Sequence, residues 1–109
     1  MALGVELHKL RKAKGLGLRE LARIAKISPA FLSQVESGKV TPPAEEKLRA
    51  LAKALGCEED RLIVLSGRLP SDVMKIIQKH PCEYMALIRR LRKLSAVELD
   101  QIQSESRNQ

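Results

Sequence analysis

The chain has 109 residues, of which 44% are hydrophobic and 30% are charged, and its net charge is +7. This length fits either one compact domain or a small domain with an appendage, and the basic excess favours a nucleic acid or another anionic surface. With no run of 18 apolar residues and no basic-then-apolar leader, the sequence excludes a membrane span and favours a cytoplasmic protein.

The N-terminal part predicts two helices with aliphatic and small residues on their inner faces. Apolar spacing predicts a helix over about 3–14, which Gly15 ends, and a second helix that begins at Leu18. The positions that carry this spacing are Leu3, Leu7, Leu10, Leu21, Ala22 and Ala25. Because Ala22 is small, a following helix can cross the second one closely.

The helical spacing of apolar residues breaks at Ile27 and resumes with Leu32 and Val35. This pattern predicts a third helix over 29–37. Ser28 is placed to cap the first free amides, and a proline at position 29 loses no donor that the helix needs. Gly38 can adopt the left-handed conformation that ends a helix.

Two further helices complete the predicted N-terminal domain. Pro42 and Pro43 stiffen the approach to a helix over about 44–55, whose inward residues are Leu48, Leu51, Ala52 and Leu55. A fifth helix is predicted over 58–66 and ends at Gly67. The expected fold class is therefore all-α.

Residues 7–55 resemble the helix-turn-helix domain of the lambda-repressor and Cro type, also called the XRE family. The matching strings are LHKLRKAKG, LRELARIAKIS, PAFLSQVESGKVTPP and LRALAKALG. An ordinary helical hairpin would not need the combination of Ala22, Ile27, Ser28, Val35, Glu36 and Gly38. The resemblance implies a five-helix DNA-binding domain over 1–68, with the third helix lying in the major groove.

The resemblance also implies which residues meet DNA. The base-facing residues are expected to be Pro29, Ala30, Phe31, Ser33 and Gln34. Gln34 is the strongest polar reader, because its amide can pair both ways with adenine. Arg19, Ser28 and Lys39 are expected to contact phosphate, although Arg19 is equally compatible with a solvated position. Phe31 either lies beside the sugar–phosphate chain or a thymine methyl, or covers a hydrophobic crevice.

In the family, an arginine of the first helix pairs with a glutamate near the end of the recognition helix. Arg11 and Glu36 occupy these positions, so we expect a partly buried ion pair that clamps the two helices. The chain departs from the pattern at Gly17, where a Ser or Thr cap is usual, and at Leu18, where a Gln commonly contacts DNA. At Lys26, often glycine, a left-handed backbone costs roughly 1 kcal/mol.

The resemblance stops at Gly67, and residues 69–109 predict a helical extension. One helix is expected to begin near Ser71 and to be broken by Pro81, and a second runs over about 82–94. The capping box of Ser95 and Glu98 opens a last helix, and residues 104–109 are expected to be frayed.

The extension carries more apolar positions than it can bury alone. Its apolar stripe consists of Val73, Ile77, Tyr84, Ile88, Leu91, Leu99 and Ile102. We therefore expect it either to pack on the fifth helix or to meet a second copy, and we interpret it as a dimerisation segment. The basic run Arg89, Arg90, Arg92 and Lys93 is interpreted as a solvated face rather than a contact to flanking DNA.

The sequence shows no nucleophile–base pair, carboxylate dyad or glycine-rich phosphate loop, so we expect no catalytic residue and no cofactor. The two cysteines, Cys57 and Cys82, form no ligand pattern. His80 and Cys82 flank Pro81, but no further ligand lies near them in the sequence, and no metal site is expected.

These features predict a sequence-specific transcriptional regulator of double-stranded DNA, most simply a repressor acting as a homodimer on a near-palindromic operator. The alternative is a protein-interaction module, such as an antitoxin that masks a partner protein, in which DNA binding is secondary. The apolar side chains of Leu18, Pro29 and Ala30 leave room for this alternative.

Overall fold

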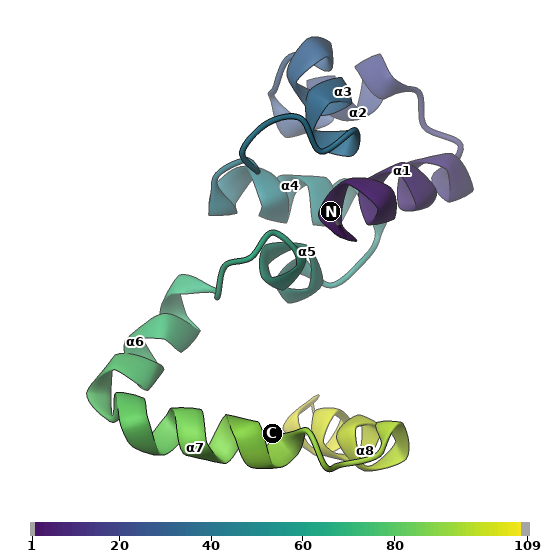
Figure 1. Ribbon diagram of the computed structural model, residues 1–109. Coiled ribbons are helices and arrows are strands. Elements are labelled where there is room, and N and C mark those ends of the chain that lie inside the picture. The colour runs from purple at the N-terminus through teal and green to yellow at the C-terminus, as the bar shows by residue number, and fades with distance from the viewer. Residues whose placement is uncertain (1, 108–109) are drawn as a thin grey trace. The chain divides into compact units, whose positions relative to one another are not determined.

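The computed structural model describes residues 2–107, and every regular element within them is a helix (Figure 1). In chain order these are α1 (Ala2–Lys14), α2 (Leu18–Ala25), α3 (Pro29–Glu36), α4 (Glu45–Leu55), α5 (Glu59–Leu65), α6 (Ser71–Lys79), α7 (Pro81–Leu91) and α8 (Ala96–Arg107). The all-α prediction is confirmed. The chain divides into two compact units, residues 1–71 and residues 72–109.

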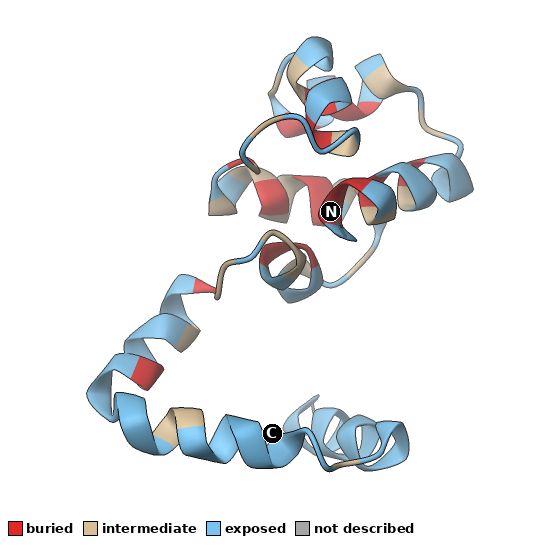
Figure 2. Ribbon diagram, viewed as in Figure 1, coloured by how far each residue is buried: buried red, intermediate tan, exposed pale blue. Residues whose placement is uncertain are grey.

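The first unit is built around a core of aliphatic and alanine side chains. Its buried members are Leu3, Leu7, Leu21, Ala22, Ala25, Leu32, Val35, Leu48, Leu51, Ala52, Leu55, Leu62 and Ile63. They come from all five helices and lie on the sides that face one another (Figure 2). Each buried Leu or Ile contributes about 1.5–3 kcal/mol relative to an exposed one. The inward positions predicted for α2, α3 and α4 are all buried.

The turn between α2 and α3 is tight because Lys26 adopts a left-handed backbone, with φ 58° and ψ 46°. The amide of Lys26 donates to the carbonyls of Ala22 and Arg23, and the amide of Ile27 donates to the Ala22 carbonyl at 3.0 Å. Lys26 is the one non-glycine residue with positive φ in the described part of the chain. The turn thereby satisfies the last carbonyls of α2.

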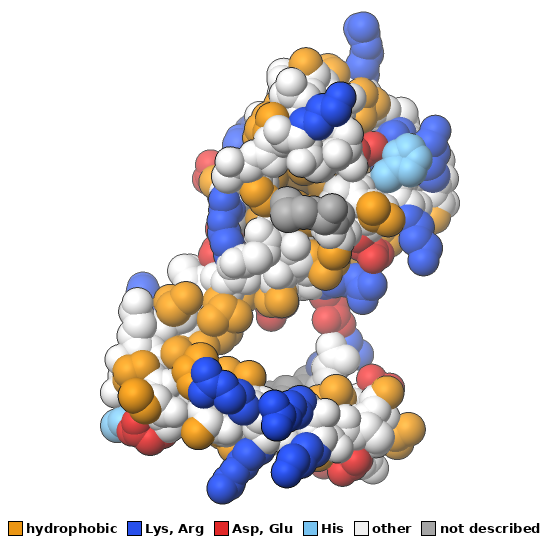
Figure 3. Space-filling model, viewed as in Figure 1, with side chains coloured by type: hydrophobic (Ala, Val, Ile, Leu, Met, Phe, Trp, Pro, Cys, Tyr) orange, Lys and Arg blue, Asp and Glu red, His pale blue; other side chains and the backbone are white. Residues whose placement is uncertain are grey.

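The second unit leaves much of its apolar surface exposed. Ile77 is the buried residue of α6, whereas α7 and α8 have none (Figure 2). Exposed aliphatic residues include Ile76, Leu87, Ile88, Leu91, Val97, Leu99 and Ile102. Hydrophobic side chains lie open on this unit beside Lys and Arg (Figure 3). No helix between residues 2 and 107 has the length and apolar character needed to cross a bilayer.

Three boundaries in the second unit differ from the predicted ones. Pro81 occupies the first turn of α7, where its fixed φ suits a helix and no amide is needed, and α7 ends at Leu91 rather than near residue 94. The α8 helix continues through Arg107, so residues 104–107 are helical rather than frayed, and a basic residue in the last turn suits the helix dipole. Residues 108–109 lie outside the described residues.

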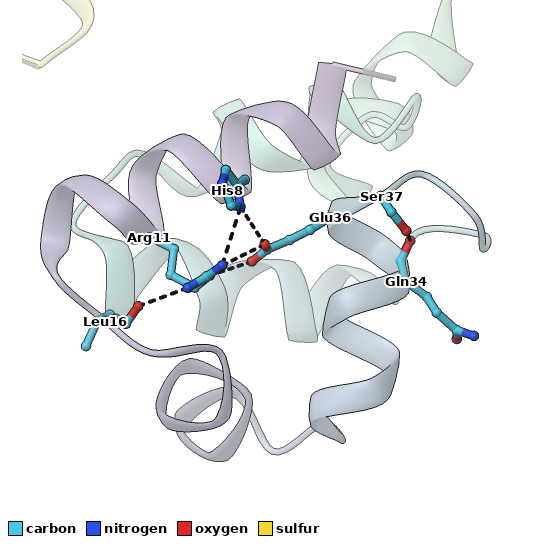
Figure 4. Close-up of polar contacts among 6 residues, drawn as sticks. All are labelled: His8, Arg11, Leu16, Gln34, Glu36 and Ser37. Atoms are coloured by element: carbon cyan, nitrogen blue, oxygen red, sulfur yellow. Dashed lines mark hydrogen bonds and ion pairs between the residues drawn. The ribbon is translucent and has the colours of Figure 1, made fainter.

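An ion pair between Arg11 and Glu36 joins α1 to the end of α3 (Figure 4). Arg11 Nε donates to Glu36 Oε2 at 2.7 Å, and Nη2 donates to Oε1 at 3.0 Å. The third arm of the guanidinium, Nη1, donates to the Leu16 carbonyl at 3.1 Å. The side chains are 9% and 8% exposed, so this two-pronged contact is shielded from water.

The groups around Arg11 and Glu36 keep both of these side chains charged. Burial alone would raise the pKa of Glu36, but hydrogen bonds from Arg11 and His8 outweigh it and hold that pKa below its usual value. The hydrogen bond to Glu36 raises the pKa of Arg11. His8 Nδ1 lies 3.0 Å from Glu36 Oε1, so the imidazole adds a third group to the clamp.

The close approach of α1 to α3 depends on Gly4, a residue that the sequence pattern did not indicate. A Cβ built on Gly4 would lie 2.7 Å from the Val35 carbonyl oxygen and still closer to that of Glu36. Both atoms belong to backbone, so a side chain at this position would push the helices apart.

We expect Gly4→Ala to destabilise the first unit by about 1–3 kcal/mol in urea unfolding, because the added methyl displaces the end of α3. Gly17→Ser is the matched control. Nothing lies within 4 Å of a Cβ at Gly17, and a serine there can cap α2, so this change should be neutral or stabilising. Equal stability of Gly4→Ala and the wild type would refute the close-approach argument.

We expect the buried pair to show a coupling energy of about 1–3 kcal/mol in a double-mutant cycle of Arg11→Met and Glu36→Gln, measured by urea unfolding. Arg61 and Glu6 serve as the reference pair, since they lie 3.3 Å apart with side chains 57% and 20% exposed. Their coupling should stay below about 1 kcal/mol. Additive effects of the two substitutions at the buried pair would contradict the clamp.

Candidate nucleic-acid interface

The α2–α3 pair presents one face of α3 to solvent. Leu32 and Val35 of α3 are buried against the core together with Leu21, Ala22 and Ala25 of α2. The opposite side of α3 carries Pro29, Ala30, Ser33 and Gln34, all of which are exposed. Figure 4 shows the Gln34 side chain pointing away from the helices around it. Four of the five residues expected to face bases thus share one open surface.

Phe31 is placed differently from the other four. Its ring is partly buried and packs against the core of the first unit. This matches the alternative in which Phe31 covers a crevice, and it leaves less of the ring open to a base than a fully outward position would. Phe31 therefore lies between the exposed face of α3 and the core of the first unit.

Ser28 caps α3, as its position before Pro29 predicted. Its Oγ accepts a hydrogen bond from the Phe31 amide at 3.0 Å. A hydroxyl group also carries one hydrogen of its own. Because Ser28 is exposed, that hydrogen can be donated to a phosphate oxygen while the cap is kept.

Lys39 stands on the loop that follows α3. The Lys39 amide donates to the Gln34 carbonyl at 2.9 Å, and Ser37 Oγ donates to the same carbonyl at 3.1 Å. Gly38 turns the chain with φ 74°, a conformation that costs a glycine little. Lys39 itself is exposed, and its backbone is fixed directly beside the end of α3.

The start of α2 also faces solvent through Arg19, which is exposed. The N-cap residue, Gly17, makes no side-chain cap, so the first amides of α2 are left for other acceptors. Leu18 packs against the core instead of presenting a polar group. Arg19 is therefore the exposed basic side chain at this helix end.

Sequence reasoning missed three residues that support this surface, namely Gly4, His8 and Arg68. His8 could have been found, because it lies three residues before Arg11 and so shares its helix face. Arg68 donates to the backbone carbonyls of Pro42 and Pro43, a contact that no local pattern signals. In the described part of the chain, no three His, Cys, Asp or Glu residues are grouped as metal ligands.

Comparison with known proteins gives this arrangement a family. The family model described as "Helix-turn-helix domain" matches residues 2–63. The chain is 41% identical over 56 residues to the HTH-type transcriptional regulator DdrOP3 of Deinococcus deserti, which covers 51% of this chain and 43% of that protein. The chain spans less than half the length of the curated relatives that it matches.

The similar solved structures include those of two proteins whose names describe them as regulators. The clp gene regulator ClgR from Corynebacterium glutamicum has a TM-score of 0.53 and 30% identity, covering 83% of this chain and 86% of that one. SinR, a master regulator for biofilm formation solved in complex with DNA, has a TM-score of 0.52 and 30% identity, covering 55% of this chain and 95% of that one. Because the family model matches more than half of the chain, this chain belongs to the helix-turn-helix domain family.

Proposed function

We propose that the protein is a sequence-specific repressor that places α3 in the major groove of an operator. The observation that carries this proposal is the open face of α3, which joins Gln34 to the small side chains of Ala30 and Ser33. A major groove about 12 Å wide admits an α-helix, and small residues let the backbone approach the bases. A regulator bound at a promoter represses simply by occupying it.

The contacts divide into two kinds in this proposal. Gln34 reads base edges, whereas Lys39, Arg19 and Ser28 hold phosphates on either side of the helix. The charge of this part of the chain supports the phosphate contacts, because residues 1–43 contain eight basic and three acidic residues. The clamp between Arg11 and Glu36 fixes the angle at which α3 enters the groove. Few strong donors lie on α3, so DNA shape contributes to the preference.

We further propose that the protein acts as a homodimer held by residues 69–109. Support comes from the exposed aliphatic side chains of α7 and α8, since a monomer rarely leaves so many of them open on one small unit. Two-fold symmetry would then make the operator a near-palindrome, with half-sites about one helical turn apart. A different protein partner, as in an antitoxin, is the second candidate for the same surface.

We expect Gln34→Ala to weaken binding to the preferred operator by about 1–3 kcal/mol and binding to random DNA much less, because only the operator offers the matching base. Lys39→Ala should weaken both alike and lower the slope of log affinity against log salt by about one for each bound subunit. Binding titrations over a salt series on DNA selected from random sequences would measure both effects.

The control for Lys39→Ala is Lys53→Ala, which removes the same charge from an exposed position on α4 and should leave binding nearly unchanged. If Gln34→Ala weakens operator and random DNA equally, Gln34 does not read bases. Specificity would then rest on Ser33, Phe31 and DNA shape.

We expect the full chain to sediment as a dimer at tens of micromolar, roughly the range of a weak homodimer, and a chain ending at Ser71, which keeps the whole first unit, to be folded and monomeric. In the full chain, Leu87→Glu with Ile88→Glu should also give monomers, because charges replace apolar contacts. Exposed Gln101→Glu is the control and should keep the dimer. A full chain that is monomeric under these conditions would rule out the homodimer and favour the second candidate.

A further inference from the structure

The loop after α3 contains two consecutive prolines, Pro42 and Pro43. Neither residue has an amide hydrogen, so this stretch offers carbonyl acceptors but no backbone donors of its own. Pro43 is buried and Pro42 is partly buried, and their carbonyl oxygens must therefore find donors elsewhere in the protein. A buried carbonyl without a donor is costly.

A single side chain supplies both donors. Arg68 Nη1 donates to the Pro43 carbonyl oxygen, and Nη2 donates to that of Pro42 at 3.0 Å. The backbone of Arg68 is itself fixed at the end of α5, where its amide donates to the Ile63 carbonyl at 3.3 Å. Gly67, with φ 88°, makes the turn that brings Arg68 into this position.

The residues that follow Arg68 are bonded to the same region. The amide and hydroxyl of Ser71 donate to the Glu45 carboxylate at 3.0 and 3.2 Å. Glu45 closely follows the two prolines in the sequence and begins α4. Arg49 Nη2 donates to Glu45 at 3.0 Å and holds this carboxylate in place. The segment 68–71 is therefore attached both to the loop after α3 and to the first turn of α4.

The other end of the loop is fixed by α3. The Lys39 amide is bonded to the Gln34 carbonyl at 2.9 Å, and Val40 is partly buried and packs against the core. The chain between these contacts and the Arg68 contacts is only a few residues long. The Lys39 backbone is thus restrained on its N-terminal side by α3 and on its C-terminal side by the contacts of Arg68 with the two prolines.

We propose that Arg68 is a positioning residue for DNA binding, which acts by holding the loop that presents Lys39 to a phosphate. This inference rests on the proposed role of Lys39. The guanidinium of Arg68 is engaged with two carbonyls and partly buried, so its role is to fix the backbone rather than to meet the phosphate itself. The DNA-binding loop is in this way tied to the segment that leads into α6.

A double-mutant cycle in DNA affinity tests this proposal on the full chain. Lys39→Ala should weaken binding to the selected operator about three- to tenfold for each bound subunit and lower the salt slope by about one for each subunit. Arg68→Gln should produce most of the same affinity loss and slope change. Lys39→Ala added to Arg68→Gln should then cost less than about twofold, because the lysine is no longer held at its phosphate. Arg68→Lys, which keeps the charge and a donor, should recover part of the affinity.

Arg61→Gln is the control, since Arg61 is also an arginine bonded within the first unit but contacts Glu6 rather than the loop or the segment 68–71. Lys39→Ala should keep its full effect in that background. Thermal unfolding of each variant sets a common temperature well below every transition, so that loss of folded protein does not enter the affinities. If Lys39→Ala costs the same with and without Arg68, Arg68 does not position the loop. If Lys39→Ala has no effect in the wild-type background, the proposed phosphate contact itself is wrong and the positioning role falls with it.

Discussion

The buried pair of Arg11 and Glu36 is the interaction on which the arrangement of the first unit depends. Its partners come from α1 and from the last turn of α3, and a third bond reaches Leu16 in the connection to α2. Removing one partner would leave the other charge buried without compensation, which is far more costly than losing an exposed ion pair. Three segments are therefore fixed together at one point. Gly4 permits the same two helices to come close enough for the bond to form.

The two units of the chain bury their apolar side chains to different extents. In the first, five short helices close around one aliphatic core, and turns after the helices bond several of their last carbonyls. In the second, α7 and α8 keep no buried residue and expose aliphatic side chains that a stable small unit normally covers. A unit with a core of its own is thereby joined to one that leaves most of its apolar side chains uncovered.

Much of the fold was predictable because its signals are local. Apolar spacing located the helices and the core, and Ser28 and the Ser95–Glu98 capping box marked helix starts that the structure contains. The contacts of Gly4 and Arg68 were not predictable, because each joins residues more than 20 positions apart through the backbone of the partner. The position of Phe31 was left open by the sequence, since an aromatic ring suits either the core or a groove, and the structure packs it against the core.

The short connections within the first unit bear on how the protein is made. Helical folds dominated by contacts between neighbouring segments fold in about microseconds to milliseconds, whereas a ribosome adds about 5–20 residues each second. The core that supports α2 and α3 is complete once α5 has left the ribosome, before α7 and α8 have emerged. Each nascent chain thus completes the core of its first unit before the exposed aliphatic side chains of the second unit emerge, which keeps the two sets of apolar residues apart during synthesis.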